Sequence, residues 1–589
     1  MAIKRLFDLA HNALKRYPKE DMFAMKINGE WVKASTQYYI AQANKMSRGL
    51  IKLGIKPGDK IGLISHNNRT EWVIMDIGLS QIGVISVPVY PTISEEGYEY
   101  IFNNAEIKYC FVSNEELYNK LISIQPKIKS LMGIFSFEDI KGVANWKEIL
   151  DLGEEDSTQS EIEDITNTIK TDDIATLIYT SGTTGHPKGV ALTHENIISN
   201  VLNSIPRLPE TKLDYKHIRA FSFLPLCHVF ERMLLYFYLY NGYSIYFAES
   251  IEKVGDNIKE VKPHFMTVVP RMVEKVYDKI YNTGVNAGGI KSKIFHWSLA
   301  LIENYEIGKN IGIKGWIADQ LVFKKWREGL GGNLIALICG SAALSPRLNR
   351  IFYGAGIPIL EGYGLTETSP VISVNSLKNL KFGTVGIPLE NLKLKIAEDG
   401  EILVKGASVF KGYYLDEEKT KEAFTEDGYF KTGDIGHIDG EGFLKITDRK
   451  KEIFKTSGGK YIAPQLIENM AKASKFIEQI IVIGDGEKMP AALIQPEFDF
   501  LKAWAARKAY HIGNTYEDIC NNEKVIKRIQ KEVEKLNKQL GQWEQIKKFE
   551  LTPMVWSIEN GLLTPTLKLK RKAIKEFFID LYNKIYDYH

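Results

Sequence analysis

Hydroxyl side chains, glycines and one lysine lie together in the segment Thr180–Gly189. Apolar stretches precede and follow it, Thr176–Tyr179 and Val190–Leu192, so a strand is expected on each side. Glycine lets backbone N–H groups approach phosphate oxygens closely, hydroxyls add donors, and Lys188 adds positive charge. The loop is not a Walker A loop, because no Gly-Lys-Ser/Thr follows at the required spacing. It predicts a phosphate-binding site of another kind, with Thr193 capping a helix that begins near His194.

Two later segments carry groups that suit a nucleotide. Glu361–Glu367 follows an apolar stretch, Ile357–Leu360, and contains an aromatic ring and a carboxylate. An aromatic face suits a purine, and a carboxylate suits a hard cation such as Mg²⁺. In Thr432–Asp434 the carboxylate can accept hydrogen bonds from both ribose hydroxyls. Taken alone, however, the first segment could equally be a glycine-rich turn at the end of a strand, and a lone aspartate is usually a solvated surface charge.

In this order, the segments resemble the adenylate-forming (AMP-binding) enzymes, which include acyl-CoA synthetases, luciferases and peptide-synthetase adenylation domains. The resemblance spans nearly the whole chain. It implies that Thr180–Lys188 holds the β- and γ-phosphates of ATP, and that Gly340–Leu344 lines one face of the adenine. The residues that it assigns to ATP binding are Thr180, Ser181, Gly182, Thr183, Thr184, Gly185, Lys188, Ser341, Ala342, Glu361, Gly362, Tyr363, Gly364, Asp434 and Arg449.

The resemblance also implies individual roles. Tyr363 would stack on the adenine, Thr366 would contact the α-phosphate, and Glu367 would bind Mg²⁺. Asp434 and Arg449 would hold the ribose. These roles describe activation of a carboxylic acid as an acyl-adenylate.

A lysine near the C-terminal end matches the family's catalytic lysine. The segment reads Thr-Pro-Thr-Leu-Lys, ending at Lys568, where many shorter-chain enzymes have Ser-Gly-Lys. Lys570 is the alternative, and Lys568 is favoured because Arg571 then falls at the family's following arginine. The ammonium group would offset the repulsion between the carboxylate and the α-phosphate.

A second half-reaction, thioester formation with coenzyme A, is implied as well. The C-terminal domain would rotate about a hinge at Lys451. The rotation would bring the CoA-binding residues Ser457, Gly458 and Lys460 to the site. An acyl carrier protein in place of CoA is the alternative acceptor.

The acid is assigned from Phe223–Arg232, Pro270–Tyr277 and an insert at about 278–333, which resemble long-chain fatty acyl-CoA synthetases. Phe223 and Phe230 are the predicted acyl-binding residues. For His228 two interpretations stay open, a catalytic position near the carboxylate or phosphate and a hydrogen-bonded core histidine. A shorter or aromatic acid is the alternative substrate.

The elements that must position these groups predict an α/β fold. Strands at Lys60–Ser65 and Val84–Val89 flank a helix at Glu71–Gln81, which indicates βαβ units and a parallel sheet. Asp-Gly turns between alternating strands after residue 383 predict a small antiparallel β-barrel. We therefore expect two Rossmann-like βαβ subdomains and the barrel in residues 1–447, a hinge at 448–452, and a small mobile α+β domain in 453–589.

Composition limits the partners and the compartment. Lys and Arg number 76 against 73 Asp and Glu, a net charge of +3 that argues against nucleic acid as a partner. Four cysteines without a CxxC pair favour a reducing cytoplasm. The most apolar run, Met233–Tyr240, is too short for a membrane span and predicts a core helix.

Peripheral contact with the inner face of the membrane stays open. It could involve the N-terminal stretch or the Lys-rich C-terminal region, although a packed first helix and a solvated helix face are the favoured interpretations. The oligomeric state is not determined by the sequence, and a homodimer is one alternative.

Overall fold

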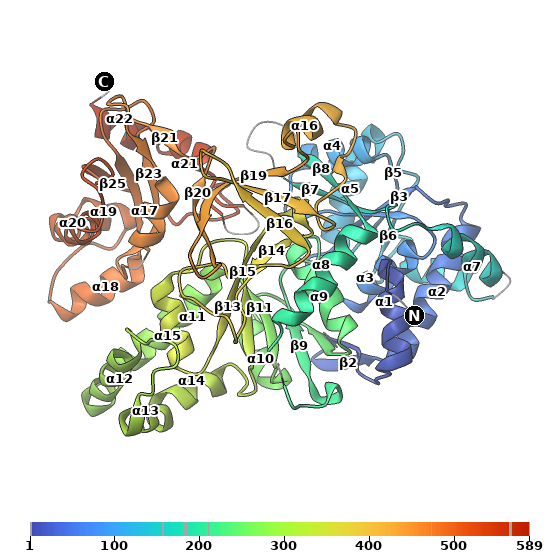
Figure 1. Ribbon diagram of the computed structural model, residues 1–589, viewed down its shortest axis with the longest axis horizontal. Coiled ribbons are helices and arrows are strands. Elements are labelled where there is room, and N and C mark those ends of the chain that lie inside the picture. Colours follow the sequence, from blue (N-terminus) through green and yellow to red (C-terminus); the bar gives the residue numbers. More distant parts are fainter. Residues whose placement is uncertain are drawn as a thin grey trace.

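A computed structural model describes residues 3–155, 158–180, 187–209, 211–472, 474–564 and 568–587 (Figure 1). The first large sheet has seven strands in the order β18-β8-β7-β4-β3-β5-β6. Strands β7, β4, β3, β5 and β6 run parallel, and β8 and β18 extend this sheet antiparallel. The bounds are β3 Lys60–Ile64, β4 Ile85–Pro88, β5 Ile107–Val112, β6 Gly133–Ser136, β7 Ile174–Thr180, β8 Lys188–Thr193 and β18 Gly412–Tyr413.

The second large sheet has nine strands in the order β15-β14-β13-β12-β11-β9-β10-β1-β2. Its six central strands are parallel, and β2, β14 and β15 add antiparallel edges. The bounds are β1 Phe23–Ile27, β2 Glu30–Ala34, β9 Arg219–Ser222, β10 Ser244–Phe247, β11 Phe265–Val268, β12 Ala336–Cys339, β13 Ile359–Gly364, β14 Val371–Val374 and β15 Ile387–Pro388. The predicted pair of βαβ subdomains is confirmed.

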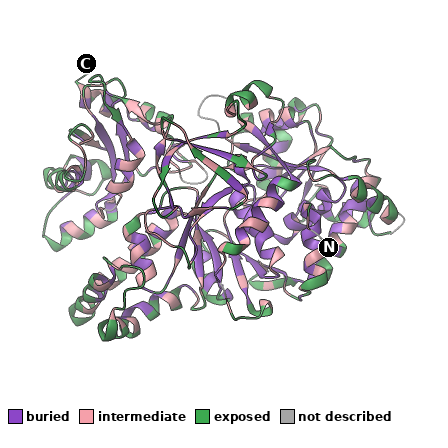
Figure 2. Ribbon diagram, in the orientation of Figure 1, coloured by how far each residue is buried: buried purple, intermediate pink, exposed green. Residues whose placement is uncertain are grey.

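Two helices that are buried on nearly every side form much of the core between the two sheets. Nearly all of α3 (Thr70–Ser80) and α9 (Val229–Tyr240) is buried, as the purple ribbons of Figure 2 show. The core helix predicted at Met233–Tyr240 is therefore confirmed. Helix α1 (Leu6–Arg16) packs its apolar face on the same core, which confirms the packed first helix. The other helices of this part are α2 Thr36–Lys52, α4 Glu95–Ala105, α5 Glu115–Ile124, α6 Trp146–Leu152, α7 Gln159–Thr168, α8 His194–Ser204 and α10 Val254–Val261.

One fully buried ion pair joins the two subdomains. Arg232 on α9 donates a hydrogen bond of 2.5 Å to Asp76 on α3. It also donates at 2.8 Å to Thr176 on β7, Ser86 on β4 and Tyr236 on its own helix. Tyr236 in turn donates to the second oxygen of Asp76. Because α9 follows β9 of the second sheet, this network ties that sheet to the first.

The segment predicted as a β-barrel forms an open antiparallel sheet instead. Its order is β16-β17-β19-β20, with bounds Leu392–Ile396, Glu401–Gly406, Phe430–Ile438 and Leu444–Arg449. The outer edge of β20 is occupied by another segment, since Leu444 exchanges backbone hydrogen bonds with Val385 and Gly386. That edge is therefore not available to β16 for closure. Helix α16 (Glu417–Ala423) lies beside β18 and β19.

The insert at about 278–333 is helical. Helices α11 (Pro270–Asn286), α12 (Gly289–Ile302), α13 (Gly312–Ala318) and α14 (Lys324–Gly329) form it, and a π-helical turn at Asp319–Phe323 joins the last two. With α15 (Pro346–Gly354) they pack on the second sheet and share a hydrophobic cluster with it. In Figure 1 these helices form the lower left part of the molecule.

The C-terminal part is a separate α+β unit with its own core, coloured orange to red in Figure 1. The predicted hinge begins inside a strand, because Asp448 and Arg449 are the last residues of β20. The unit's strands are β21 Phe454–Lys455, β22 Tyr461–Ile462, β23 Ile477–Ile483, β24 Ala491–Pro496 and β25 Lys548–Leu551, and its helices are α17 Pro464–Ala471, α18 Phe498–Arg507, α19 Tyr516–Asn521, α20 Glu523–Asn537, α21 Arg571–Phe577 and α22 Ile579–Tyr586.

Among the described residues, no helix is both long and apolar enough to cross a bilayer. All four cysteines are buried free thiols.

Replacing Asp76 by Ala should lower the free energy of unfolding by about 3–5 kcal/mol, because Arg232 would remain buried without its counter-ion. Asp139→Ala is the matched control, since Asp139 forms an exposed pair with Lys147 and should cost less than about 1 kcal/mol. Urea denaturation followed by circular dichroism measures both. Equal midpoints for the two variants would contradict the role of the buried pair.

Candidate active site

The carboxylate of Asp434 accepts hydrogen bonds from two side chains of other segments. Antiparallel pairing of β19 and β20 sets Asp434 opposite Arg449, whose Nε donates to Asp434 Oδ1 at 3.1 Å. The hydroxyl of Tyr363, at the end of β13, donates to Asp434 Oδ2 at 2.7 Å. The structure thus brings the predicted ribose carboxylate together with the predicted adenine ring and the predicted arginine.

Glu367 lies next to this group, in a short turn after β13. Tyr413 on β18 donates its hydroxyl to Glu367 Oε1 at 3.0 Å. Burial raises the pKa of Glu367, and Tyr413, Arg449 and Lys188 oppose that shift. A bound cation would favour the charged carboxylate, so the residue fits the predicted Mg²⁺ ligand. Thr366 is half-buried in the same turn.

A Mg²⁺ ion here would take most of its ligands from elsewhere. Among the described residues, no group of three or more metal-ligating side chains exists. Mg²⁺ usually binds through one or two carboxylates together with substrate phosphates and water. A single protein carboxylate, that of Glu367, is consistent with this mode of binding.

Strands β7 and β8 form the base of the phosphate loop. Thr180 pairs with Lys188 across them, at the point where the loop leaves the sheet. The ammonium of Lys188 lies 4.6 Å from the ring centroid of Tyr413, whose hydroxyl bonds Glu367. Burial, followed by the charges of Lys451 and Lys419, lowers the pKa of Lys188. The predicted residues Ser181, Gly182, Thr183, Thr184 and Gly185 lie outside the described residues.

The segment predicted to line the adenine, Gly340–Leu344, is hydrogen-bonded to the neighbouring strand β13. Glu361 accepts the backbone N–H of Leu344 at 3.0 Å, which ties the segment after β12 to β13. Ser341 has φ of 71°, a left-handed conformation that is uncommon for serine. Ala342, the next residue, is exposed.

Close backbone approach explains the two glycines of the segment Glu361–Glu367. A Cβ atom on Gly364 would lie 1.9 Å from the carbonyl oxygen of Pro370, and one on Gly362 would lie 3.3 Å from that of Ser373. Position 364 therefore accepts only glycine without a shift of the backbone. The chain can then turn directly from β13 into the segment that carries Glu367.

The C-terminal domain places one lysine against this group. Lys568 is partly buried, and its ammonium feels the charges of Asp434, Glu452, Glu367 and Arg449. Burial and then Arg449 lower its pKa to about 8. Lys570 is exposed. Of the two candidate lysines, Lys568 is therefore the one that faces the predicted nucleotide site.

Arg571 positions the segment that carries Lys568. Its guanidinium donates to Glu452 at 2.7 Å and to Glu468 on α17 at 2.5 Å. Gln465 also donates to Glu452 at 2.7 Å. Arg571 thus links Lys568 to the hinge and to α17, and Lys568 itself bonds back to Thr564 through its backbone.

Sequence reasoning missed Tyr413, Glu452 and Glu468. Glu452 lies in the predicted hinge, residues 448–452, where no role of its own was assigned to it from the sequence. Tyr413 and Glu468 are ordinary residues in their local patterns, and only the folded chain brings them to Glu367 and Arg571.

His228 caps the N-terminus of α9. Its Nδ1 accepts the N–H of Phe230 at 3.2 Å, which assigns the imidazole proton to Nε2. Burial and then the charge of Lys568 lower the pKa of His228 to about 3. His228 is therefore a neutral hydrogen-bond donor on the side of the site that Lys568 approaches.

The two predicted acyl-binding residues lie in different parts of the core. Phe223 packs with the insert helices, whereas Phe230 packs with the core between the sheets. A Cβ atom on Gly340 would lie 2.9 Å from the Phe230 ring, so this ring touches the backbone just before Ser341. The structure does not bring the two phenylalanines together.

The predicted CoA residues lie on the surface of the C-terminal domain. Ser457, Gly458 and Lys460 are exposed in the turn between β21 and β22. Lys460 lies 5.6 Å from the ring centroid of Trp543, within the C-terminal domain. Lys451, the predicted hinge, is exposed after β20.

Polar contacts hold the two domains in this arrangement. Arg271 on α11 forms an ion pair with Glu478 on β23. The ammonium of Lys475 lies 3.0 Å from the ring centroid of Tyr281, also on α11. The arrangement keeps Lys568 at the site and the β21–β22 turn in solvent.

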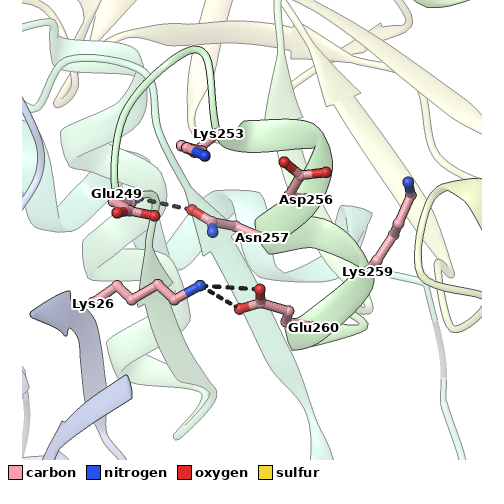
Figure 3. A pocket seen from close by; sticks show the side chains of 7 residues that line it. All are labelled: Lys26, Glu249, Lys253, Asp256, Asn257, Lys259 and Glu260. Atoms are coloured by element: carbon pink, nitrogen blue, oxygen red, sulfur yellow. Dashed lines mark hydrogen bonds and ion pairs between the residues drawn. The ribbon is translucent and has the colours of Figure 1, made fainter. Parts of the chain in front are cut away.

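A surface hollow of about 420 Å³ near α10 has a different character (Figure 3). Lys26 and Glu260 pair across it, with the lysine Nζ 2.9 and 3.0 Å from the two carboxylate oxygens. Its lining residues are Lys26, Glu249, Lys253, Asp256, Asn257, Lys259 and Glu260. Such a charged lining does not suit an acyl chain.

Comparison with known proteins agrees with the geometry. Residues 10–414 match the AMP-binding enzyme family, and residues 451–589 match the AMP-binding enzyme C-terminal domain. The chain belongs to the family of AMP-binding enzymes.

Its relatives within the family are ligases. The chain is 34% identical to long-chain-fatty-acid–CoA ligase FadD15 of Mycobacterium bovis, over 97% of this chain and 95% of the relative. It is 33% identical to human long-chain-fatty-acid–CoA ligase 1, over 91% and 80%. The fold also matches the crystal structure of the anthranilate CoA ligase AuaEII with anthranoyl-AMP, with a TM-score of 0.72, 18% identity and 98% coverage of both chains.

ATP affinity should fall as the pH rises through about 8. The lowered pKa of Lys568 means that its ammonium is present below pH 8 and is lost above it, so the attraction to the phosphates disappears there. Isothermal titration calorimetry between pH 7 and 9.5 measures the dissociation constant. Lys568→Arg keeps its charge and should remove this pH dependence, and an unchanged decline in that variant would count against Lys568 as its source.

Proposed function

We propose that the protein activates a long-chain fatty acid with ATP to acyl-AMP, and then transfers the acyl group to CoA, releasing pyrophosphate and AMP. The observation that carries the proposal is the approach of Lys568, from the C-terminal domain, to Asp434 and Glu367 of the N-terminal part. The ligase relatives, which align over nearly the whole chain, support the choice of acid and acceptor.

In the first half-reaction, a carboxylate oxygen of the acid forms a bond to the α-phosphorus, and the bond from that phosphorus to pyrophosphate breaks. Two anions must meet, so positive charge is needed where the negative charge develops. The ammonium groups of Lys568 and Lys188 supply it. Mg²⁺, held by Glu367, would add positive charge at the phosphates. Nε2–H of His228 can donate to the acid's carboxylate or to the phosphate.

The nucleotide's other parts are held by the groups around Asp434. The two carboxylate oxygens of Asp434, which bond Tyr363 and Arg449 in this structure, can accept hydrogen bonds from the ribose hydroxyls. The ring of Tyr363 stacks on the adenine, with Ser341 and Ala342 on the other face. Thr366 contacts the α-phosphate.

In the second half-reaction, the CoA thiol attacks the acyl carbonyl carbon, and AMP leaves. The C-terminal domain rotates about Lys451, which withdraws Lys568 and brings Ser457, Gly458 and Lys460 to the site. Two features support the rotation: the CoA residues are exposed in the present arrangement, and polar contacts such as Arg271–Glu478 connect the domains.

An acid panel with ATP, Mg²⁺ and CoA tests the substrate assignment. We expect palmitate and oleate to give higher kcat/KM than acetate, benzoate or coumarate, since each buried CH₂ is worth about 0.8 kcal/mol, or about fourfold. AMP and thioester are measured together. A flat profile from four to sixteen carbons would overturn the long-chain assignment, and turnover only with a holo carrier protein would overturn CoA as the acceptor.

Lys568→Ala should lower adenylate formation by about 10²–10³-fold, because the charge that meets the transition state is removed. Thioester formation from supplied acyl-AMP should be retained, since the rotation withdraws this residue. Pyrophosphate exchange measures the first step, and thioester release measures the second. Lys570→Ala is the control, because Lys570 is exposed and should leave both steps unchanged. Equal losses in both steps for Lys568→Ala would refute the two-state role.

A further inference from the structure

Large apolar side chains are exposed along one face of α13 and the π-helical turn after it. Ile313, Trp316, Ile317 and Leu321 are 78%, 66%, 37% and 46% exposed. Residues three and four positions apart lie on the same face of a helix, so these four form one stripe. Exposed apolar groups scattered singly are normal on a protein surface, but a continuous stripe marks an interaction site.

The stripe lies on a firmly packed element. On the other face of the same segment, Ala318, Val322, Phe323 and Trp326 are buried in the hydrophobic cluster of the second sheet. Figure 1 places α12 and α13 at an edge of the molecule, and Figure 2 shows much exposed surface there. Because the inner face of this segment is packed in the core, the stripe on its other face is fixed in an outward orientation.

Lysines without ion-pair partners surround the stripe. Ion pairs engage three nearby acidic groups, Glu303 with Arg347, Glu306 with Lys309 and Asp319 with Arg327, whereas Glu328 on α14 is exposed and has no ion pair among the described residues. Within the described part of the chain, none of the exposed lysines of α12–α14 forms an ion pair; they are Lys291, Lys293, Lys314, Lys324 and Lys325. The surface thus combines an apolar stripe with an excess of positive charge, five exposed lysines against Glu328.

We propose that the face of α12–α14 that carries Ile313, Trp316, Ile317 and Leu321 docks on the surface of an anionic lipid bilayer. Apolar side chains of an interfacial helix enter the boundary between headgroups and acyl chains, and its lysines pair with anionic headgroups. Tryptophan suits this depth, because its ring is apolar and its N–H can reach a polar partner. A second copy of the chain is a poorer occupant, since a two-fold interface on this face would bring like-charged lysines together.

Docking through this surface would place the part of the core that contains the predicted acyl-binding residue Phe223 close to the lipid. The inner face of α12–α14 belongs to the same hydrophobic cluster as Phe221, which lies on β9, and Phe223, which directly follows it. The proposal goes beyond the ligase reaction and does not depend on it, because docking can be measured without any substrate. The basic C-terminal helix α20 and the packed helix α1 are not part of this surface.

Vesicle flotation with the full chain tests the proposal. Vesicles of phosphatidylcholine alone are compared with vesicles that contain phosphatidylglycerol. We expect the wild type to bind the anionic vesicles, and Ile313→Ser/Trp316→Ser/Leu321→Ser to lower binding at least tenfold. The control, Val32→Ser/Met132→Ser/Ile251→Ser, removes similarly exposed apolar groups elsewhere and should bind as the wild type does.

A charge series separates the two contributions. Lys314→Glu/Lys324→Glu/Lys325→Glu should abolish the preference for anionic vesicles, whereas Lys129→Glu/Lys141→Glu/Lys531→Glu, with the same change of charge at other exposed lysines, should lower it much less. Circular dichroism shows whether each variant is folded. Absence of vesicle binding by the wild type, equal binding by the apolar variant, or a dimer in sedimentation that this variant dissociates would each overturn the proposal.

Discussion

The buried pair between Arg232 and Asp76 holds the molecule's two large sheets in one orientation. Burying a charge is costly unless it is paired and hydrogen-bonded, so the guanidinium requires its partners on α3, β4 and β7 at fixed positions. Lys188 extends from the first sheet, and Tyr363 and Glu367 follow from the second. The distance between these groups therefore depends on a constraint that lies outside the site.

The third component, the C-terminal domain, contacts the rest of the chain through Arg271, Lys475 and the ring of Phe500. Arg571 fixes Lys568 relative to its own domain through Glu452 and Glu468. The contacts made by Arg271 and Lys475 across the domains are polar, and water can replace such contacts more readily than a buried apolar interface. The two half-reactions proposed above require such a difference. The two large sheets keep their orientation, whereas Lys568 leaves the site when the C-terminal domain rotates.

Much of the local structure followed from the sequence. Strands β3 and β4, the helix α9 and the cap at Thr193 were predicted because they depend on neighbouring residues: β-branched runs, apolar periodicity and hydroxyl caps. The predicted closure into a barrel was wrong, because closure depends on what occupies the far edge of β20, and backbone near Gly386 occupies it.

The sequence by itself determined the family and the order of the nucleotide-binding segments, since each is a short run of residue types with its own chemistry. Only the tertiary structure decided that Lys568 rather than Lys570 meets Asp434, that Tyr413 bonds Glu367, and that the outward apolar face lies on α13 rather than at either end of the chain. The physical reason is the same in each case. Burial, pKa and exposure are set by residues far away in the chain, and only folding brings those residues together.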